Sequence, residues 1–352
     1  MKFSRVSIII LNWNGWRDTV ECLESVYRID YPNYDVIVVD NASHDESIQK
    51  IKEYAQGKLK VKSKFFDYNP ENKPIKLFEL TEDEALKGKF NRPLYEKYDP
   101  DRRLIIIKNR DNYGFTGGNN VGMKFAASIL EPKYIMLLNN DTVVARDFLS
   151  ILTGRAEHHT NIGIVSPKVV KYHNSRIIDS AGHVLGGVRI VDRGKGTLDE
   201  SQFDKEELVM GAIAAAALYN TEMILQVGLF NETFETNYED AEYSWRANKF
   251  GWLGLYVPDA IVYHKRGATT NKSRSIRSRI SKNYWRNLTV TVFRYGTLIN
   301  KIRLIIWTII VSDGSFLKYL LKMNPVPPMN IYWGLHEAMR RLRSDYHRVK
   351  YL

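Results

Sequence analysis

The sequence predicts an α/β fold in which helices flank a mostly parallel sheet. Short aliphatic runs alternate along the chain with segments whose apolar residues recur at helical spacing. The aliphatic runs are nearly continuous, as in strands buried on both faces, and strands that alternate with helices form parallel sheets with right-handed crossovers. The 352 residues, 44% of them hydrophobic, are enough for one large domain or for a domain with an appendage.

The elements follow one another in this alternating order over the first part of the chain. We expect strands at 6–11, 36–39, 104–107 and 134–138, and helices at 18–27, 45–54 and about 120–129. The stretch 57–103 is long for a connection between a helix and a strand, so it should be an insertion. Within it, Asn69-Pro-Glu-Asn-Lys-Pro74 is typical of a turn between two short strands, which predicts a small hairpin.

The strand expected at 134–138 ends at a polar cluster, Asn139-Asn140-Asp141. In an open α/β sheet, ligands bind at the carboxyl ends of the strands. A carboxylate placed there suits Mg²⁺ or Mn²⁺, which usually also coordinates phosphates of a substrate. The alternative is a turn rich in Asn and Asp that binds nothing.

Polar residues also follow the first two strands. Asp40 ends the second strand, where a carboxylate followed by short polar side chains suits a ribose or a base edge. The first strand leads into Asn12-Trp-Asn-Gly-Trp16, which lacks the G-x-G-x-x-G pattern of a dinucleotide site. Trp13 either stacks on a nucleobase or packs in the core.

The segment 112–122 contains four glycines before a predicted helix. Glycine permits positive φ and a close approach of the backbone to a ligand, and the N-terminus of a following helix favours phosphate. The segment is therefore either a loop that faces a ligand or a tight structural loop.

Acidic residues begin the helix expected at about 237–246, in Asn-Tyr-Glu-Asp-Ala-Glu-Tyr-Ser-Trp-Arg. Acids are common in a first helical turn because they complement the helix dipole. Acids beside aromatic residues also suit a general base, since partial burial raises the pKa of a carboxyl group. The next strand, 254–264, ends in His264, which is either structural or a metal ligand.

Basic residues gather at the C-terminal end. Residues 264–352 carry 18 Lys and Arg against 3 Asp and Glu, whereas the whole chain has a net charge of +11. This end should meet an anionic partner. Its cations alternate with aliphatic and Trp residues, notably at 304–311, which favours a helix in a membrane interface over a nucleic-acid groove. A solvated basic helix packed on its own domain is the alternative.

The single cysteine, Cys22, permits no intrachain disulfide and excludes a Cys-rich zinc site. A reducing compartment is the simpler expectation. The apolar run at 6–11 is too short for a signal peptide, and no segment approaches the roughly 20 apolar residues that span a bilayer. We therefore expect a cytoplasmic protein.

Taken in order, these segments resemble the inverting family 2 glycosyltransferases of the GT-A fold, particularly their rhamnosyltransferase-like, non-processive branch. The similarity covers about 4–266 and includes Val-Val-Asp-Asn-Ala-Ser, Asn-Tyr-Gly-Phe-Thr-Gly-Gly-Asn-Asn, Leu-Leu-Asn-Asn-Asp-Thr, Tyr-Glu-Asp240 and Val-Pro-Asp-Ala-Ile-Val-Tyr-His264. It implies a GT-A domain over 1–266, with the insertion at 57–103. A basic amphipathic helical tail over 267–352, which should associate with a membrane, would follow.

The resemblance also implies roles for individual residues. Asp240 would be the general base, and Asp141 and His264 would bind Mg²⁺ or Mn²⁺. The nucleotide would contact Trp13, Asp40, Asn112, Gly117 and Asn119. The donor or acceptor sugar would contact Asn139, Glu239, Trp245 and Arg246. Asn139 stands where the metal-binding motif often has its first carboxylate, which leaves the metal with less protein charge.

The implied function is a metal-dependent, inverting transfer of a sugar from a nucleotide-diphosphate sugar to an acceptor hydroxyl. We expect the acceptor to be a lipid-linked saccharide or a surface-glycan precursor at the inner face of the cell membrane, and we expect no nucleic-acid partner. Two alternatives are a sugar-nucleotide-forming enzyme and a non-catalytic protein that binds nucleotide sugars.

Overall fold

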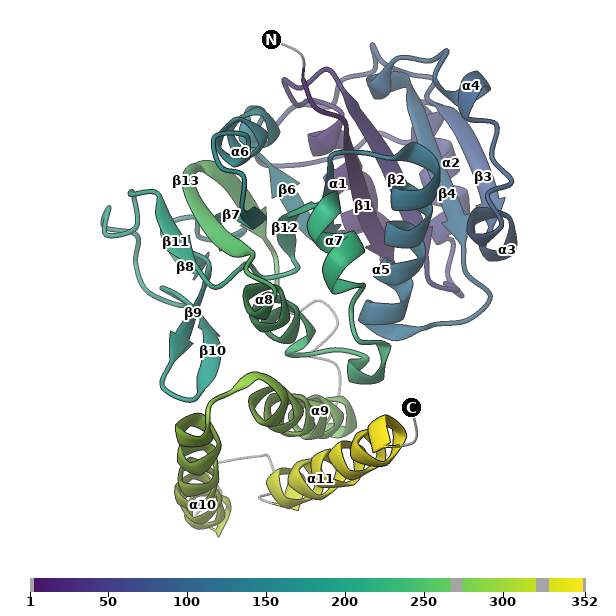
Figure 1. Ribbon diagram of the computed structural model, residues 1–352. Helices are drawn as coiled ribbons and strands as arrows, with labels where there is room; N and C mark the ends of the chain where they lie inside the picture. The colour runs from purple at the N-terminus through teal and green to yellow at the C-terminus, as the bar shows by residue number, and fades with distance from the viewer. Residues whose placement is uncertain (1–2, 267–273, 321–328, 351–352) are drawn as a thin grey trace.

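The structure is a computed structural model that describes residues 3–266, 274–320 and 329–350. Its centre is an 11-stranded mixed sheet with the main strand order β11-β13-β7-β12-β5-β1-β2-β4-β3 (Figure 1). In addition, β6 pairs with β13 and β8 pairs with β7. The mostly parallel sheet flanked by helices confirms the predicted fold class.

The N-terminal part of the sheet is parallel. Its strands are β1 (Val6–Asn12), β2 (Tyr34–Asp40), β3 (Lys76–Thr81), β4 (Arg103–Lys108) and β5 (Tyr134–Asn139). The register of β1 and β2 places Asn12 beside Asp40. The polar residues that follow these strands therefore lie at one edge of the sheet, as expected for parallel strands.

The C-terminal part of the sheet is mixed. It contains β6 (Thr142–Val144), β7 (Ile162–Lys171), β8 (Ile178–Ser180), β11 (Glu207–Val209), β12 (Ala216–Asn220) and β13 (Leu253–His264). Strand β12 runs antiparallel to both β5 and β7, and it joins the two halves of the sheet. A separate hairpin is formed by β9 (His183–Gly186) and β10 (Arg189–Asp192).

Helices cover both faces of the sheet. One face packs on α1 (Trp16–Val26), α2 (Ser47–Ala55) and α6 (Phe148–Ala156). The other packs on α5 (Gly114–Phe125), α7 (Thr221–Val227) and α8 (Glu239–Lys249). Successive strand residues alternate between the two cores, since Ile8 and Ile10 belong to the first and Ile9 to the second.

The hairpin predicted inside 57–103 is absent. This stretch instead adds β3 as a parallel edge strand beside β4, followed by α3 (Glu82–Leu86), α4 (Arg92–Tyr95) and a 3₁₀ turn at Pro100–Arg102. Pro70 and Pro74 lack the N–H groups that a strand ladder needs. Lys73 is held instead in a buried ion pair with Glu24 of α1, at 3.1 Å.

The glycine-rich segment is also different from the prediction, because it is helical. Helix α5 begins at Gly114, about six residues earlier than expected. A Cβ on Gly118 would lie 2.5 Å from Leu11 Cδ1, and one on Gly122 would lie 2.8 Å from Ile9 Cγ2. These glycines therefore allow the helix to pack closely on the sheet, where larger side chains would collide.

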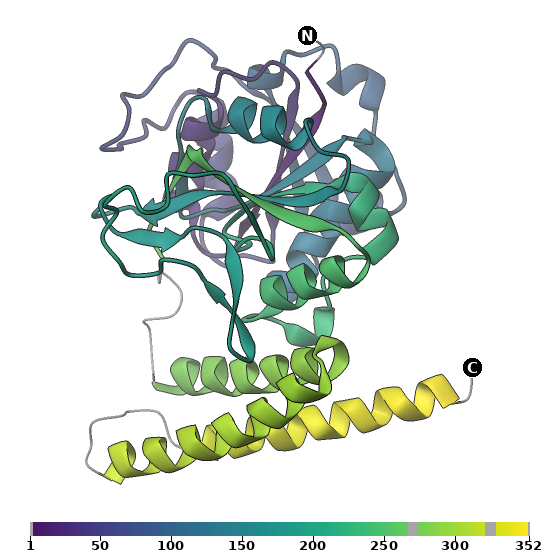
Figure 2. The ribbon, with the colours of Figure 1, turned by 60° about the vertical axis from the view of Figure 1, so that its left-hand side comes forward.

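The C-terminal helices form a layer below the sheet domain (Figures 1 and 2). They are α9 (Arg274–Tyr295), α10 (Leu298–Leu320) and α11 (Met329–Lys350), so the predicted helical appendage is present. Helix α9 packs on α8, where Trp285 and Leu288 share a buried cluster with Tyr238 and Trp245. Within the described ranges, no helix combines the length and apolar character needed to cross a membrane.

Candidate active site

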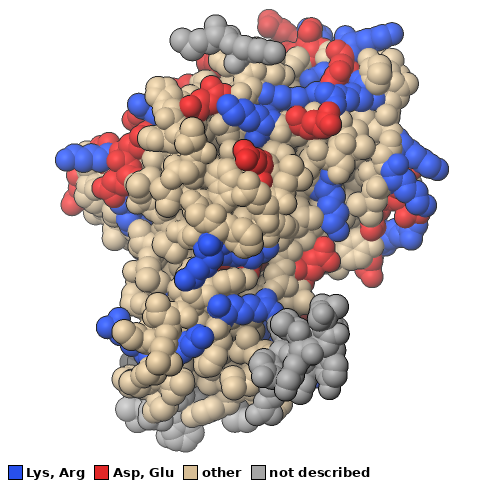
Figure 3. All heavy atoms as spheres, viewed as in Figure 1, with Lys and Arg blue, Asp and Glu red and all other residues tan. Residues whose placement is uncertain are grey.

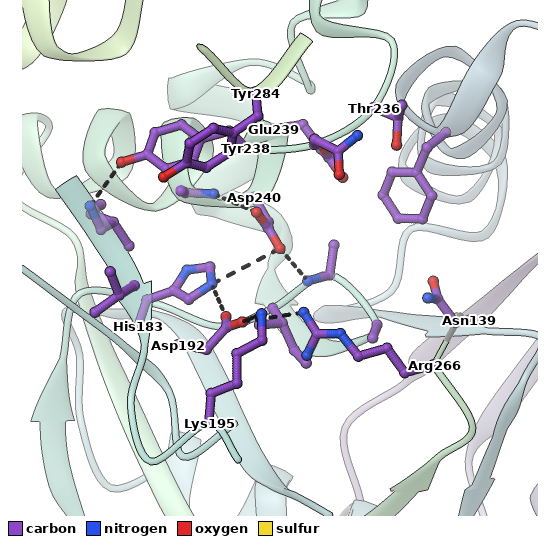
Figure 4. A pocket seen from close by; sticks show the side chains of 18 of the residues that line it. Asn139, His183, Asp192, Lys195, Thr236, Tyr238, Glu239, Asp240, Arg266 and Tyr284 are labelled. Atoms are coloured by element: carbon purple, nitrogen blue, oxygen red, sulfur yellow. Dashed lines mark hydrogen bonds and ion pairs between the residues drawn. The ribbon is translucent and has the colours of Figure 1, made fainter. Parts of the chain in front are cut away.

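A cavity of about 450 Å³ lies between the sheet, hairpin β9–β10, the start of α8 and α9. Each of these elements contributes side chains to its wall (Figure 4). Asn139 comes from the end of β5, Asp192 from β10, Asp240 from α8, His264 from the end of β13 and Tyr284 from α9. The cavity therefore joins residues that are far apart in the sequence.

Asp240 lies in the first turn of α8, and its carboxylate points into this cavity (Figure 4). Its Oδ2 accepts a hydrogen bond from the backbone N–H of Ala214 at 3.2 Å, and its Oδ1 accepts one from Ala241 at 2.8 Å. The side chain is 21% exposed. Asp240 is thus held in one orientation while it stays accessible to a molecule in the cavity.

Glu239 has a different environment from its neighbour. Burial, and then the charge of Asp240, raise the pKa of Glu239 well above its usual range. Its Oε2 is buried and has no hydrogen-bond partner among the described residues. Burial therefore favours the neutral form of Glu239, although both acids line the cavity.

His183 is a cavity residue that the sequence did not single out. Its Nε2 lies 3.2 Å from Asp192 Oδ1 and 3.9 Å from Asp240 Oδ2 (Figure 4). Burial alone would lower the pKa of His183, but the two carboxylates raise it above its ordinary value. The two carboxylates thus favour the protonated form of the imidazole, and that form would help to orient Asp240 and compensate its charge.

The predicted pair Asp141 and His264 is brought together by strand pairing. Strand β6 pairs with β13 so that His264 is opposite Thr142, and Asp141 Oδ1 lies 3.2 Å from His264 Nε2. The other ring nitrogen, Nδ1, contacts Asp179 Oδ2 at 2.8 Å. Burial opposes protonation, but hydrogen bonds to both carboxylates raise the pKa of His264 to about 9.

Asp179 was also missed by the sequence analysis. It is buried in the short strand β8 and forms a second ion pair with Arg266. A carboxylate on the far nitrogen of a histidine orients the ring and fixes which nitrogen is free for a metal. Asp179 therefore has the geometry of an orienting partner for His264.

The donor atoms of Asp141 and His264 fit a divalent cation that takes its remaining ligands from phosphate and water. The imidazole must lose its proton before it can bind a metal. No group of three or more His, Cys, Asp or Glu that could hold a metal occurs in the described part of the chain. The protein would thus supply only part of the coordination shell.

The residues predicted to contact the nucleoside lie at the ends of β1 and β2. Asp40 is buried, and its Oδ1 accepts hydrogen bonds from Asn12 and from the Ser43 hydroxyl, both at 2.7 Å. Trp13 is 43% exposed, so it is not a core residue. A rigid carboxylate beside an accessible indole is a suitable surface for a base and its ribose.

Three other residues that were predicted to contact the nucleotide instead make contacts within the protein. Asn112 Oδ1 accepts hydrogen bonds from Asn41 at 2.8 Å and from the Gly114 backbone at 2.9 Å. Asn119 donates to the Phe115 carbonyl of its own helix, and Gly117 packs against Tyr113. None of the three lines the cavity described above.

Trp245 and Arg246, which were predicted to contact a sugar, lie on α8 away from the cavity. Trp245 is buried in the cluster between α8 and the C-terminal helices. Arg246 pairs with Glu242 at 3.0 Å and donates to the carbonyls of Val227 and Leu229. Both side chains support the position of α8, whereas Asn139 and Glu239 do line the cavity.

Three Lys and Arg side chains also line the cavity. Lys195 pairs with Asp192 at 2.9 Å, and Arg266 pairs with Asp179. Arg189 is different, because it takes part in no ion pair with any residue that the structure describes. Its guanidinium donates to the Tyr284 hydroxyl at 2.7 Å and lies 5.0 Å from the ring centroid of Trp307 in α10.

Comparison with known sequences finds a similarity to one protein family at the N-terminal end. A model of the family "Glycosyl transferase family 2" matches residues 7–74. The low-salt glycan biosynthesis hexosyltransferase Agl10 of Haloferax volcanii is 24% identical over 149 residues, which are 42% of this chain and 47% of that protein. The chain thus spans about half the length of this relative.

Comparison with solved structures covers nearly the whole chain. The mannosyltransferase PcManGT from Pyrobaculum calidifontis, in complex with GDP-Man and Mn²⁺, has a TM-score of 0.55 at 15% identity over 96% of this chain and 88% of that one. GalNAc-T7, with UDP, GalNAc and Mn²⁺, has a TM-score of 0.56 at 14% identity over 98% and 58%. S. aureus TarS has a TM-score of 0.51 at 15% identity over 89% and 45%. The protein therefore has the GT-A fold, and its residues 7–74 are similar to the glycosyl transferase family 2 model.

Proposed function

We propose that this protein is a metal-dependent inverting glycosyltransferase, which moves a hexose or deoxyhexose from a nucleotide-diphosphate sugar to an acceptor hydroxyl. The observation that carries the proposal is that Asp240 and His264 line the same cavity, with Asp141 directly beside His264. A base and a candidate diphosphate site thus share one space. The family 2 domain and the GT-A fold support this proposal, as do structural neighbours that hold GDP-Man or UDP with Mn²⁺.

The donor would bind along the carboxyl ends of β1, β2 and β5. Trp13 and Asp40 would hold the nucleoside, and Asn139 at the end of β5 would contact the transferred sugar. A Mg²⁺ or Mn²⁺ ion held by Asp141 and His264 would supply charge neutralisation for the leaving diphosphate. Asn139, Asp141 and His264 come from two neighbouring parts of the sheet, which makes the site rigid.

Asp240 would act as the base. It takes the proton of the acceptor hydroxyl as that oxygen bonds to the anomeric carbon, while the bond from this carbon to the diphosphate oxygen breaks on the opposite side. One carboxylate is sufficient for such an inverting displacement. Because burial favours the neutral form of Glu239, we assign the role of base to Asp240, whose side chain is 21% exposed to the cavity.

A lipid-linked saccharide is the acceptor that fits the C-terminal helices best. The side chains of one face of α10 are exposed and apolar: Leu298, Ile299, Ile302, Ile305, Ile306 and Ile310. At about 100° per residue they span roughly 140° of the helix, and Lys301 and Arg303 lie at its two borders. This is the pattern of a helix that lies in an anionic membrane interface.

The charges seen on the surface agree with this placement. In Figure 3, acidic and basic side chains are mixed over the sheet domain, whereas the charged side chains visible over the lower helical layer are basic. Arg189 connects the two regions, since it lines the cavity and stacks on Trp307 of α10. It is well placed to bind the phosphate of a lipid-linked acceptor. The enzyme would then act as a peripheral protein at the inner face of the cell membrane.

Incubation of the protein and Mn²⁺ with a panel of UDP-, GDP- and dTDP-sugars tests the proposed function. We expect slow hydrolysis of one donor, loss of this hydrolysis in EDTA and its return with Mn²⁺. Pyrophosphate release from a nucleoside triphosphate and a sugar phosphate would instead indicate a sugar-nucleotide-forming enzyme. Donor binding without any turnover, with or without acceptor lipids, would indicate a binding protein.

A further inference from the structure

The loop before α8 has an unusual backbone. Glu235, Asn237 and Tyr238 have φ angles of 61°, 67° and 72°, a region that side chains other than glycine rarely adopt. Residues 236–238 also line the cavity, and Asp240 is two residues further along the chain. Such conformations persist only where the surrounding structure holds them. The loop therefore requires contacts that fix it.

Some of those contacts come from α5, where the N–H groups of Phe115 and Thr116 donate to the Glu235 carbonyl at 3.0 and 3.2 Å. Most of the side-chain contacts come from α9, in the C-terminal part of the chain. Asn287 is fully buried, and its side-chain amide donates to the carbonyls of Phe234, Thr236 and Asn237 at 3.1, 3.3 and 2.7 Å. The neighbouring Arg286 is 3% exposed and donates to the carbonyls of Thr233 and Phe234 at 3.2 and 3.1 Å. Two adjacent side chains thus bind four carbonyls of one loop.

The two side chains are also fixed relative to each other. Arg286 Nε donates to Asn287 Oδ1 at 2.9 Å, which orients the amide so that its N–H groups face the loop. Burial is the main reason why the pKa of Arg286 is lowered, to about 10. A buried guanidinium is costly unless hydrogen bonds compensate it, and most of the bonds observed here go to the loop.

We infer that Arg286 and Asn287 are positioning residues for the catalytic base: they hold residues 233–238 in the strained conformation that aims Asp240 into the cavity. This inference rests on the proposed role of Asp240 as the base. Under this inference, α9 is a part of the active site. Its role then differs from the lipid-facing role proposed for α10. The residues proposed to bind the nucleotide sugar, at the ends of β1, β2 and β5, take no part in this contact between α9 and the loop.

The variant Asn287→Leu tests the inference, because it removes both N–H donors at similar volume. We expect kcat for transfer of the sugar from the donor that the nucleotide-sugar panel identifies to fall by about 10- to 100-fold. Small misplacements of a reacting group have effects of this size. The Kd of that donor with Mn²⁺ should stay within threefold. Hydrogen exchange should become faster in the peptide covering 233–238, and remain unchanged in peptides from β1 and β5.

Thr289→Val is the matched control. Thr289 is buried in the same helix and donates only to the Trp285 carbonyl within that helix, so this variant should keep the wild-type kcat and exchange pattern. If Asn287→Leu does not fold, Arg286→Gln replaces it with the same expectations. A folded variant whose kcat and loop exchange stay within threefold of wild type overturns the inference. Full activity of Asp240→Asn would overturn the proposed function instead.

Discussion

Glu239 and Asp240 are adjacent acids with different surroundings. The Asp240 carboxylate receives two backbone N–H groups, whereas one oxygen of Glu239 is buried without a partner among the described residues. A sequence motif alone does not distinguish the two. Their surroundings do, because burial favours the neutral form of Glu239.

Substitution of each acid by its amide should therefore have unequal effects. Asp240→Asn removes the base and should lower kcat for transfer by about 10²- to 10⁴-fold, with the donor Kd unchanged. Glu239→Gln replaces one neutral group by another and should lower kcat by less than about tenfold. Steady-state kinetics and calorimetric donor binding measure both. A larger loss of kcat in Glu239→Gln than in Asp240→Asn would indicate that Glu239 is the base instead.

His264 makes the stability of the metal-free protein depend on pH. Its pKa is about 9 in the folded protein against 6.5 as the ordinary value, so its ion pairs stabilise the fold fully below about pH 6.5. That contribution is lost as the pH rises through 9 and amounts to on the order of 2 to 3 kcal/mol.

Urea unfolding in EDTA at pH 6.5 and pH 9.5 measures this contribution. The free energy of unfolding of the wild type should fall more between these values than that of His264→Gln. Glu239 titrates in both proteins, so the difference between them isolates the histidine. Parallel pH profiles for the two proteins would show that His264 is not protonated in the folded state.

The sequence predicted some of these residues because they follow strands directly. Asp141 and His264 each stand at a strand end, and their 3.2 Å separation depends only on the pairing of β6 with β13. His183, Asp192 and Asp179 lie on strands of only three or four residues. Such strands have no recognisable periodicity, so only the tertiary structure could reveal these three residues.

At the scale of elements, the glycines of α5 illustrate how packing overrides local preference. Glycine lowers helix propensity, which is why the sequence indicated a loop. The helix forms because its glycines permit a close approach to β1 and β2, which a propensity argument does not include. The missing hairpin has a similar cause, since the contact of Lys73 with Glu24 is long-range.

Two glycine-to-alanine substitutions test this explanation. A Cβ on Gly122 would lie 2.8 Å from Ile9 and 2.9 Å from Val39, so Gly122→Ala should destabilise the protein by about 1 to 3 kcal/mol. Gly154 in α6 has no atom within 4 Å of such a Cβ, so Gly154→Ala should be neutral or stabilising by up to about 1 kcal/mol. Urea unfolding compares them. Equal stabilisation by both would refute the packing argument.

The exposed face of α10 gives a prediction for membrane binding. Ile302→Ser combined with Ile306→Ser should weaken flotation with phosphatidylserine-containing vesicles at least about tenfold, since each buried isoleucine contributes about 1.5 to 3 kcal/mol. Leu225→Ser, which changes a leucine that is 73% exposed on α7, is the matched control and should bind as wild type. Undiminished flotation of the double variant would show that this face of α10 does not bind lipid.

At the scale of the whole molecule, the cavity that holds Asp240 lies between the sheet domain and α9, the first of the basic C-terminal helices, because Tyr284 of α9 lines it. The basic helices lie below the sheet domain, with hairpin β9–β10 pointing toward them (Figure 2). Deleting the C-terminal helices is therefore a poor test of membrane binding. It would expose the cluster around Trp285 and Trp245 and release the loop before Asp240.

The charge asymmetry and the α/β class could be read from the sequence, because both depend on composition and periodicity. The packing of α9 on α8 could not, since it depends on Trp285, Arg286 and Asn287 meeting a loop about 50 residues earlier in the chain. Within the described C-terminal residues, α9 is thus proposed to position Asp240 and α10 is proposed to face lipid.

The stereochemistry of the first product tests the central proposal most directly. Time-resolved proton NMR of the nucleotide sugar that the protein hydrolyses with Mn²⁺ detects the anomer released before mutarotation. A single base that activates the incoming oxygen predicts the anomer opposite in configuration to the donor, and predicts that Asp240→Asn forms it much more slowly. Release of the retained anomer, or an unchanged rate in Asp240→Asn, would contradict the proposal.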